Sequence, residues 1–463
     1  MSLPHVVIIG AGFAGHQAAR TLTRLAAGRA RITIVNPTDY FLYAPLLPEV
    51  ATGVLEPRRV TVSLTGTLPG VRLVLGEVDA IDLRRRVVSY ANPEGMTGSL
   101  TYDRLILAAG SVNKLLPIPG VAHYAHGFRG LAEALYLRDT LVRQIELADG
   151  AAPEEARART TFVVAGAGYT GTEVAAAGVL FTDALAREHP GLGDVRARWL
   201  LLDLADRVLP GLDVRMSRAA EGVLRARGVD VRTGVSVAEA CRDGVRLTDG
   251  SFVPTRSLIW CVGVRPDPLV ADLGLDTEDG RLVVDEYLTV PGHPELLACG
   301  DAAAVPDLTM PGALTGMTAQ HAVRQGRRAA QIVAASYGTG ERRPYKHHDL
   351  GFVVDLAGRQ AVANPLGLPL AGLPAKVVTR GYHLLSIPGN RIRVGSDWIL
   401  DTLLPRQAVQ TGLVTAAAVP LDTAAPPDTP APPDTPTPPD TAAWPDTAAP
   451  PDTAVRARPA SHP

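Results

Sequence analysis

The stretch His5-Val-Val-Ile-Ile-Gly10-Ala-Gly12-Phe-Ala-Gly15-His16 decides the fold of this chain. Its Val and Ile residues form an uninterrupted β-branched run, which indicates a strand buried on both faces of a parallel sheet. Gly10 allows the tight turn out of the strand, and Gly12 lets a pyrophosphate come close to the backbone. Gly15 lets the following helix pack on the sheet, and the free N–H groups of that helix face the phosphates. The stretch therefore predicts a dinucleotide site.

A second copy, Thr161-Phe-Val-Val-Ala-Gly166-Ala-Gly168-Tyr-Thr-Gly171-Thr-Glu173, repeats the strand, the glycine spacing and the start of an apolar helix. One such fingerprint is weak evidence, because a glycine-rich strand–helix turn can form without any ligand. Two copies in the same context favour two bound dinucleotides. They indicate an enzyme that passes a hydride from one dinucleotide to the other.

The composition excludes several classes of protein. The 463 residues are 46% hydrophobic with a formal net charge of −2, which fits a globular chain of several domains and argues against a nucleic-acid partner. The three cysteines form no close pair, which argues against a disulfide-stapled secreted protein and against a flavin disulfide reductase. The pairs His123/His126 and His347/His348 lack Cys or carboxylate partners, so no metal site is predicted. We expect a cytoplasmic protein without a signal peptide or a transmembrane span.

The last residue of the second strand in each unit is the predicted ribose ligand. In the first unit this residue is Asn36, which accepts hydrogen bonds through its amide oxygen but lacks the usual carboxylate charge. In the second unit it is Asp203, which would accept both ribose hydroxyls of NADH and repel the 2′-phosphate of NADPH. Arg207 lies four residues further on and opposes this preference. We expect NADH.

The segment Pro37-Thr-Asp-Tyr-Phe-Leu-Tyr-Ala-Pro45-Leu-Leu-Pro48-Glu49-Val-Ala-Thr-Gly53 closely resembles the stretch after the second strand in type II NADH dehydrogenases, single-chain flavoproteins that reduce quinones. The likeness extends over about residues 5–414. It implies FAD as the cofactor, NADH as the substrate and a quinone as the electron acceptor, with Pro45 and Leu46 beside the isoalloxazine ring. A proline-rich and aromatic loop packed for stability would explain this composition but not the order of the residues.

Three further segments resemble parts of that family. Ala109-Gly110-Ser111 resembles the motif that closes the first flavin half-domain, and Gly263 repeats the strand-then-glycine arrangement on the NADH side. Gly300-Asp301 resembles the flavin ribityl motif, although a surface turn is the plain alternative. The expected cofactor-binding residues are Gly10, Gly12, Phe13, Ala14, Gly15, Asn36, Pro45, Leu46, Val78, Ala109, Gly110, Ser111, Gly166, Gly168, Tyr169, Thr170, Gly171, Asp203, Gly263, Gly300, Asp301 and Ala319.

Two side chains are predicted to take part in catalysis. Glu173 lies at the start of the second unit's helix, where the helix dipole stabilises a carboxylate and a capping role is the plain alternative. The family resemblance implies that Glu173 positions the nicotinamide or communicates with the quinone site. Gln320 lies in an Ala-Gln motif that borders the quinone pocket in the family, where it would bind a quinone carbonyl or simply brace its helix.

The predicted fold class is α/β, with two Rossmann-like dinucleotide-binding domains. A strand beginning at residue 71 is expected to open a β excursion from the first sheet. The expected parts are an FAD domain at 1–125 and 281–344, an inserted NAD(H) domain at 126–280, a C-terminal α/β segment at 345–414 and a disordered Pro-Asp-Thr repeat tail at 415–463.

The C-terminal segment carries two apolar helical stripes flanked by arginines. The stripes are Val377, Val378, Gly381, Tyr382, Leu384 and Leu385, and Val394, Trp398, Ile399 and Leu403. They are compatible with a peripheral surface on the inner face of the cell membrane. They are equally compatible with helices that cover the core or form a homodimer contact.

We therefore interpret the chain as an FAD-dependent NADH dehydrogenase that passes two electrons to a quinone without proton pumping. Two alternatives stay open. One is a soluble FAD-dependent NAD(P)H oxidoreductase with another acceptor, and the other is an NADH-responsive redox sensor.

Overall fold

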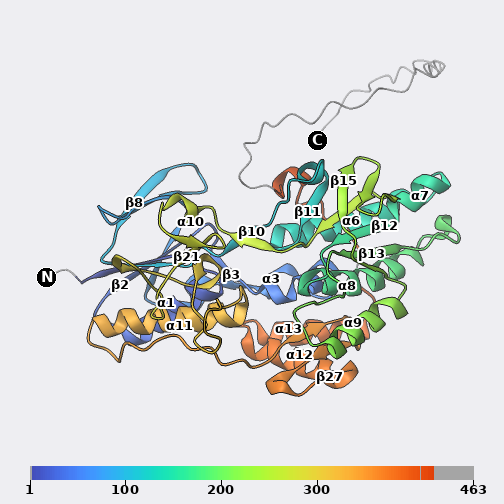
Figure 1. The fold of residues 1–463 in the computed structure, drawn as a ribbon. Coiled ribbons are helices and arrows are strands. Elements are labelled where there is room, and N and C mark those ends of the chain that lie inside the picture. The colour runs from blue at the N-terminus through green and yellow to red at the C-terminus, as the bar shows by residue number, and fades with distance from the viewer. Residues whose placement is uncertain (1–2, 407, 422–463) are drawn as a thin grey trace, which may run out of the picture. The chain divides into compact units, whose positions relative to one another are not determined.

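A computed structural model describes residues 3–406 and 408–421 of the chain. Most of the predicted repeat tail, residues 422–463, lies outside the described residues. Two parallel sheets with helices on their faces organise the described part (Figure 1). Both sheets are built on the same plan, as their strand orders show.

The first sheet has the strand order β22-β23-β9-β1-β2-β5. It consists of β1 (His5–Ile9), β2 (Arg31–Asn36), β5 (Val71–Leu75), β9 (Arg104–Leu107), β22 (Thr289–Val290) and β23 (His293–Ala298). All its pairings are parallel except that of β22 with β23. The helices α1 (Phe13–Leu25) and α11 (Ala319–Ser336) pack against each other beside it (Figure 1). Segments from both ends of the chain therefore build one layer.

The strand at residue 71 differs from the sequence prediction. It pairs in parallel with β2 and so belongs to the main sheet, because its register from Ile32↔Val71 to Asn36↔Leu75 continues that sheet. The excursion begins only with β6 (Glu77–Asp82), followed by β7 (Val87–Ala91) and β8 (Thr97–Thr101) in an antiparallel sheet.

The second sheet has the strand order β11-β18-β12-β13-β14 and is parallel throughout. It consists of β11 (Ala125–Gly127), β12 (Thr161–Ala165), β13 (Arg198–Asp203), β14 (Asp230–Thr233) and β18 (Ser257–Trp260). The associated helices are α6 (Leu131–Ala148), α7 (Pro153–Arg159), α8 (Tyr169–Ala186) and α9 (Val214–Ala226). The predicted fold class, with two Rossmann-like units, is confirmed.

Short elements connect and extend these sheets. The strands are β3 (Tyr40–Leu42), β4 (Thr61–Ser63), β10 (Ser111–Asn113), β15 (Val237–Cys241), β16 (Gly244–Leu247), β17 (Phe252–Pro254), β19 (Val264–Pro266), β20 (Thr277–Glu278), β21 (Arg281–Val283) and β24 (Ala303–Ala304). The helices are α2 (Leu47–Ala51), α3 (Pro57–Val60), α4 (Leu64–Thr67), α5 (Val121–Tyr124) and α10 (Leu269–Asp272).

The C-terminal part contains a small antiparallel sheet and two helices. These are β25 (Val353–Asp355), β26 (Ala361–Ala363), β27 (Leu370–Ala371), α12 (Gly372–Ser386) and α13 (Arg391–Leu403). After α13, the backbone N–H groups of Thr411 and Gly412 donate to the Asp139 carboxylate on α6 at 2.9 and 2.7 Å. Val419 and Leu421 are buried, so the chain stays packed beyond residue 415, where the tail was predicted to begin. Among the described residues, no helix has the length and apolar character needed to cross a membrane.

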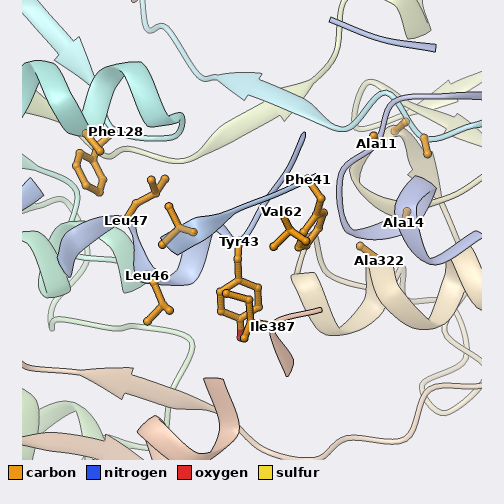
Figure 2. Packing of buried hydrophobic residues seen from close by; sticks show 14 of the residues in the cluster. Ala11, Ala14, Phe41, Tyr43, Leu46, Leu47, Val62, Phe128, Ala322 and Ile387 are labelled. Carbon is orange, nitrogen blue, oxygen red and sulfur yellow. The ribbon is translucent and has the colours of Figure 1, made fainter. Parts of the chain in front are cut away.

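One hydrophobic core joins the first unit, the second unit and the C-terminal helices. Figure 2 shows Tyr43, Leu46 and Leu47 in this core, together with Phe128 and Ile387. The segment that resembles the flavin-side loop of type II dehydrogenases is therefore packed between parts of the chain that are distant in sequence.

Candidate active site

The first glycine loop has the shape of a phosphate cradle. Gly10 has a φ of +85°, and a Cβ there would overlap the Ala108 carbonyl oxygen. A Cβ at Gly15 would overlap the Gly10 carbonyl oxygen, so the helix lies directly against the loop. A Cβ at Gly12 would instead meet no atom within 4 Å, and α1 begins at Phe13 without a side-chain cap. The loop therefore leaves open space and an uncapped helix N-terminus, which fits a dinucleotide phosphate.

The second glycine loop repeats this geometry. A Cβ at Gly166 would overlap the Cys261 carbonyl oxygen, and one at Gly171 would overlap the Gly166 carbonyl oxygen. A Cβ at Gly168 would again meet no atom within 4 Å. The helix α8 begins at Tyr169 without a side-chain cap, and Thr170 follows in its first turn. The two fingerprints therefore form equivalent cradles.

The predicted ribose ligands each hold the loop of their own unit. Asn36 Oδ1 accepts a hydrogen bond from Ala11 N at 2.8 Å, and Asp203 Oδ2 accepts one from Ala167 N at 2.6 Å. Arg207 donates to the carbonyl oxygens of Pro210 and Leu212 at 2.6 and 3.3 Å. Its guanidinium is thus held by its own turn, which weakens the sequence argument that Arg207 would attract a 2′-phosphate.

Residues predicted to hold the flavin come together from three parts of the first unit. Ser111 Oγ donates to Asp301 Oδ2 at 2.7 Å. A Cβ at Gly300 would lie 3.2 Å from the Ala14 Cβ, which places Gly300 beside the first glycine loop. Ala319 begins α11, and Thr318 caps that helix by accepting from His321 N. The first cradle and the Gly300-Asp301 turn therefore face one site, whose small residues and carboxylate fit FAD.

The two units meet where β10 pairs with β19. Lys114 N donates to the Gly263 carbonyl oxygen at 3.1 Å, so Gly263 lies next to the strand that follows Ala109 and Gly110. Val78, which was also predicted to bind the cofactor, lies in β6 of the antiparallel sheet, where it pairs with Tyr90 of β7. The sequence did not predict the pairing of β10 with β19, because each of these strands has only three residues and carries no recognisable motif.

Glu173 and Gln320 both make contacts outside their own helices. Glu173 Oε1 accepts a hydrogen bond from Asp355 N at 2.9 Å, so it links α8 to β25 and does not cap α8. Gln320 Nε2 donates to the Gly351 carbonyl oxygen at 2.5 Å. Gln320 Oε1 is buried and has no hydrogen-bond partner in the described part of the chain. That oxygen is free to accept a hydrogen bond from a ligand.

A cavity of about 340 Å³ lies between the first unit, α8 and the C-terminal segment. It brings together Pro45, Leu46 and Glu173, which the sequence had singled out. Its other lining residues are Pro48, Glu49, Thr52, Val54, Ala177, Asp355, Ala357, Gly358, Arg359, Leu373, Lys376, Arg380, Asp401, Thr402 and Arg406. Apolar and charged side chains therefore share one pocket.

Sequence reasoning did not assign chemistry to three of these charged residues. Lys376 Nζ donates to both carboxylate oxygens of Asp355 at 2.6 Å. Glu49 Oε2 accepts from Trp398 Nε1 at 2.5 Å. Lys376 is one of only three lysines in the chain, and Glu49 directly follows the Pro-Leu-Leu-Pro run. These two features of the sequence could have drawn attention to Lys376 and Glu49.

Burial shifts the pKa values of several groups around the cavity. Burial raises the pKa of Glu173 well above its usual value of 4.5, and the neighbouring Asp355 carboxylate adds to that shift. Burial raises the pKa of Glu49 to about 7, again assisted by Asp355. Burial lowers the pKa of His383 to about 4, so the imidazole that meets Tyr43 Oη at 3.1 Å is neutral at pH 7. Burial therefore favours the neutral forms of Glu49 and Glu173 in the cavity and of the neighbouring His383.

The three cysteines give no support to dithiol chemistry. All three are free, and burial raises the pKa values of Cys261 and Cys299 to about 12. Both thiols therefore stay protonated and poorly nucleophilic at neutral pH.

Comparison with known proteins agrees with this geometry. The family described as pyridine nucleotide-disulphide oxidoreductase matches residues 4–326. The chain is 32% identical to the type II NADH:quinone oxidoreductase NdhA of Mycobacterium tuberculosis, over 84% of this chain and 85% of that protein. It is 29% identical to the demethylphylloquinone reductase NdbB of Synechocystis, over 86% of this chain and 96% of that protein.

A solved structure shares the fold of the chain. The structure of NDH2 from Plasmodium falciparum in complex with NADH covers 88% of this chain and 100% of that one, with a TM-score of 0.82 and 17% identity. Together, the repeated cradle, the family match and the sequence identity to NdhA lead to one conclusion. The chain belongs to the pyridine nucleotide-disulphide oxidoreductase family and, within it, to the type II NADH:quinone oxidoreductases.

Proposed function

We propose that this chain oxidises NADH and reduces a quinone through bound FAD, without pumping protons. The proposal rests on the pair of equivalent cradles together with a cavity that is lined by the flavin-side loop and by Glu173. When bound, FAD would supply the hydride and electron chemistry. The role of the protein is to hold the two dinucleotides and the quinone close together and correctly oriented.

The first cradle would hold FAD and the second would hold NADH. Asp203 keeps its Oδ2 on the second loop and remains partly exposed, so it can accept from ribose hydroxyls. A 2′-phosphate in the same place would meet the carboxylate charge, while the Arg207 guanidinium is engaged with backbone carbonyls. This arrangement supports a preference for NADH over NADPH.

The cavity would take the quinone ring. Pro45, Leu46 and Leu373 offer apolar contacts, and the polar groups of the lining offer hydrogen bonds to the quinone oxygens. Gln320 does not line this cavity and would brace α11 through Gly351. Its Oε1 can only accept, so a contact with a quinone oxygen would use the second hydrogen of its Nε2. Glu173 would couple the NADH unit to this cavity through its hydrogen bond with Asp355 N.

The helices α12 and α13 would dock on the inner face of the cell membrane. Their exposed apolar side chains are Leu373, Val377, Leu385, Ile392, Ile399, Leu400 and Leu403. Val394 and Trp398, which the sequence placed in the same stripe, are buried and pack inward. The outward stripe, with exposed Arg391 and Arg393 beside it, suits an interface with anionic lipid.

Vesicle sedimentation tests the membrane proposal. The protein should sediment with phosphatidylcholine vesicles that contain phosphatidylglycerol, and the double variant Ile392→Glu, Leu403→Glu should stay in the supernatant. The matched control is Met96→Glu, because Met96 is an exposed apolar residue outside the C-terminal helices. A wild-type protein that fails to sediment, or a dimer that dissociates in the double variant, would contradict the membrane proposal.

A steady-state assay tests the reaction. Purified protein loaded with FAD should oxidise NADH rapidly when a short-chain quinone is added and slowly with oxygen alone. Equal rates with and without the quinone would contradict the proposed acceptor.

A further inference from the structure

Glu49 and Glu173 face the same cavity from different helices. Glu49 lies on α2, directly after the Pro45-Leu46-Leu47-Pro48 run, and Glu173 lies on α8. Both side chains are partly accessible to solvent, and both line the cavity. Each carboxyl group accepts one hydrogen bond from a neutral donor, Trp398 Nε1 for Glu49 and Asp355 N for Glu173.

Burial and the Asp355 carboxylate favour a bound proton on Glu49, whereas the Lys376 and Arg380 cations oppose it. Asp355, at the end of β25, holds the Nζ of Lys376 on α12 through both its oxygens. Arg380 on α12 lies over the Trp398 ring at 4.8 Å, and Arg406 pairs with Asp401 at 2.5 Å. Within the described residues, neither Glu49 nor Glu173 has a cation at ion-pair distance. The helix α6, which also packs on α2, carries Asp139, whose carboxylate holds the chain at residues 411–412.

The proposed reaction needs one proton that NADH does not bring. NADH gives up two electrons and one hydrogen as a hydride, whereas a quinone needs two electrons and two protons to become a quinol. The second proton must come from solvent and reach a quinone oxygen inside the pocket. An acid that is neutral near pH 7 and lines the pocket is suited to this transfer.

We propose that Glu49 is the proton donor to the quinone in the cavity of this chain. The carboxylic acid of Glu49 gives its proton to a quinone oxygen as that oxygen gains electrons. The O–H bond of Glu49 breaks, a quinol O–H bond forms, and the resulting carboxylate keeps its hydrogen bond from Trp398 Nε1. The carboxylate then takes a proton from water that reaches the cavity. This inference rests on the proposed function, because it assigns a role in the same reaction.

Stopped-flow measurement of the two half-reactions tests the proposal in the FAD-loaded protein. Glu49→Gln should leave flavin reduction by NADH within twofold of wild type. It should slow flavin reoxidation by a short-chain quinone at least tenfold at pH 7. Wild-type reoxidation should fall as the pH rises through about 7, and this fall should disappear in Glu49→Gln. The matched control is Glu56→Gln, an exposed glutamate seven residues away that should behave like wild type.

A second variant keeps the test sharp if Glu49→Gln loses FAD. Trp398→Phe removes the donor that stabilises the Glu49 carboxylate, so the fall in reoxidation should move to higher pH. Reoxidation of Glu49→Gln within twofold of wild type with an unchanged pH profile would overturn the role of Glu49. So would an unchanged profile in Trp398→Phe. If the wild-type flavin is reduced by NADH but not reoxidised by the quinone, the proposed function fails instead, and the two failures are distinguishable.

Discussion

The two dinucleotide units share a backbone plan and differ in charge at equivalent positions. The second strand ends at Asn36 in the first unit and at Asp203 in the second, and each side chain accepts from the loop N–H of its unit. The fifth residue of the next helix is Gln17 in α1 and Glu173 in α8. Gln17 Nε2 donates to Thr21 Oγ1 within α1, whereas Glu173 reaches β25.

This difference shows how one fold supports two roles. The glycines and the strand-end acceptor build the cradle in both units, so they are part of the fold. The carboxylates of Asp203 and Glu173 are added only in the second unit, which we propose binds and releases the substrate and whose helix α8 borders the cavity. The first unit is neutral at both positions, which suits a cofactor that stays bound.

The largest expected effect comes from filling a cradle. Gly15→Ala should destabilise the protein by about 1–3 kcal/mol or more and abolish FAD binding, because its Cβ would overlap the Gly10 carbonyl. Gly12→Ala should leave the unfolding temperature of the FAD-free protein near wild type but weaken FAD binding, since its Cβ enters open space. Thermal unfolding and FAD titration measure both effects. Equal stability losses in the two variants would contradict the described loop geometry.

Exchanging the strand-end residue should change cofactor choice. Asp203→Asn keeps an acceptor for Ala167 N and makes the second unit resemble the first. The ratio of kcat/KM for NADH over NADPH should fall about 10–100-fold, which is about 1.4–2.7 kcal/mol. Asp206→Asn, which changes a nearby carboxylate, is the control. An unchanged ratio in Asp203→Asn would remove Asp203 from the ribose site.

Neutralising Glu173 should change the pH dependence of stability. Its folded pKa is raised above its usual value of 4.5, so the folded protein binds more protons than the unfolded chain as the pH rises above 4.5. The stability from this group is therefore present at low pH and is lost as the pH increases. Glu173→Gln should therefore lose less stability than wild type between pH 5 and pH 8. Urea unfolding of both proteins at pH 5 and pH 8 measures the free energies of unfolding. The same stability difference between variant and wild type at both pH values would contradict the raised pKa of Glu173.

The smallest effect is expected on the first unit's side of the site. Gln320→Ala should raise the quinone KM by about three- to tenfold, the effect of losing one hydrogen bond donated by the second hydrogen of Nε2, and leave flavin reduction by NADH unchanged. Arg327→Ala, an exposed change on the same helix, should leave both rates unchanged. Slower flavin reduction in Gln320→Ala would show that Gln320 lies at the NADH side.

The cradles could be predicted from sequence because their chemistry is local. Each needs a strand, three glycines at fixed spacing and a helix, all within about fifteen residues. The strand at residue 71 was assigned to the wrong sheet, because its short apolar run does not show which neighbour it pairs with. The same limit applies to α13, where periodicity did not show that Trp398 packs inward while Ile399 is exposed.

The cavity could be predicted only in part. Pro45, Leu46 and Glu173 were found through motifs, whereas Lys376 and Asp355 meet only after the C-terminal segment folds back onto α8. A salt bridge between two helices or strands leaves no spacing pattern in a single sequence. Glu49 belongs to a segment that the sequence analysis quoted, but its hydrogen bond comes from Trp398, which lies far along the chain.

The absorbance of the bound flavin under anaerobic conditions tests whether the protein passes electrons from NADH to a quinone. NADH is added first to the purified protein and a short-chain quinone second. NADH should bleach the flavin band, and the quinone should restore it rapidly. A flavin that NADH does not bleach, or that stays bleached after the quinone is added, would contradict this electron transfer.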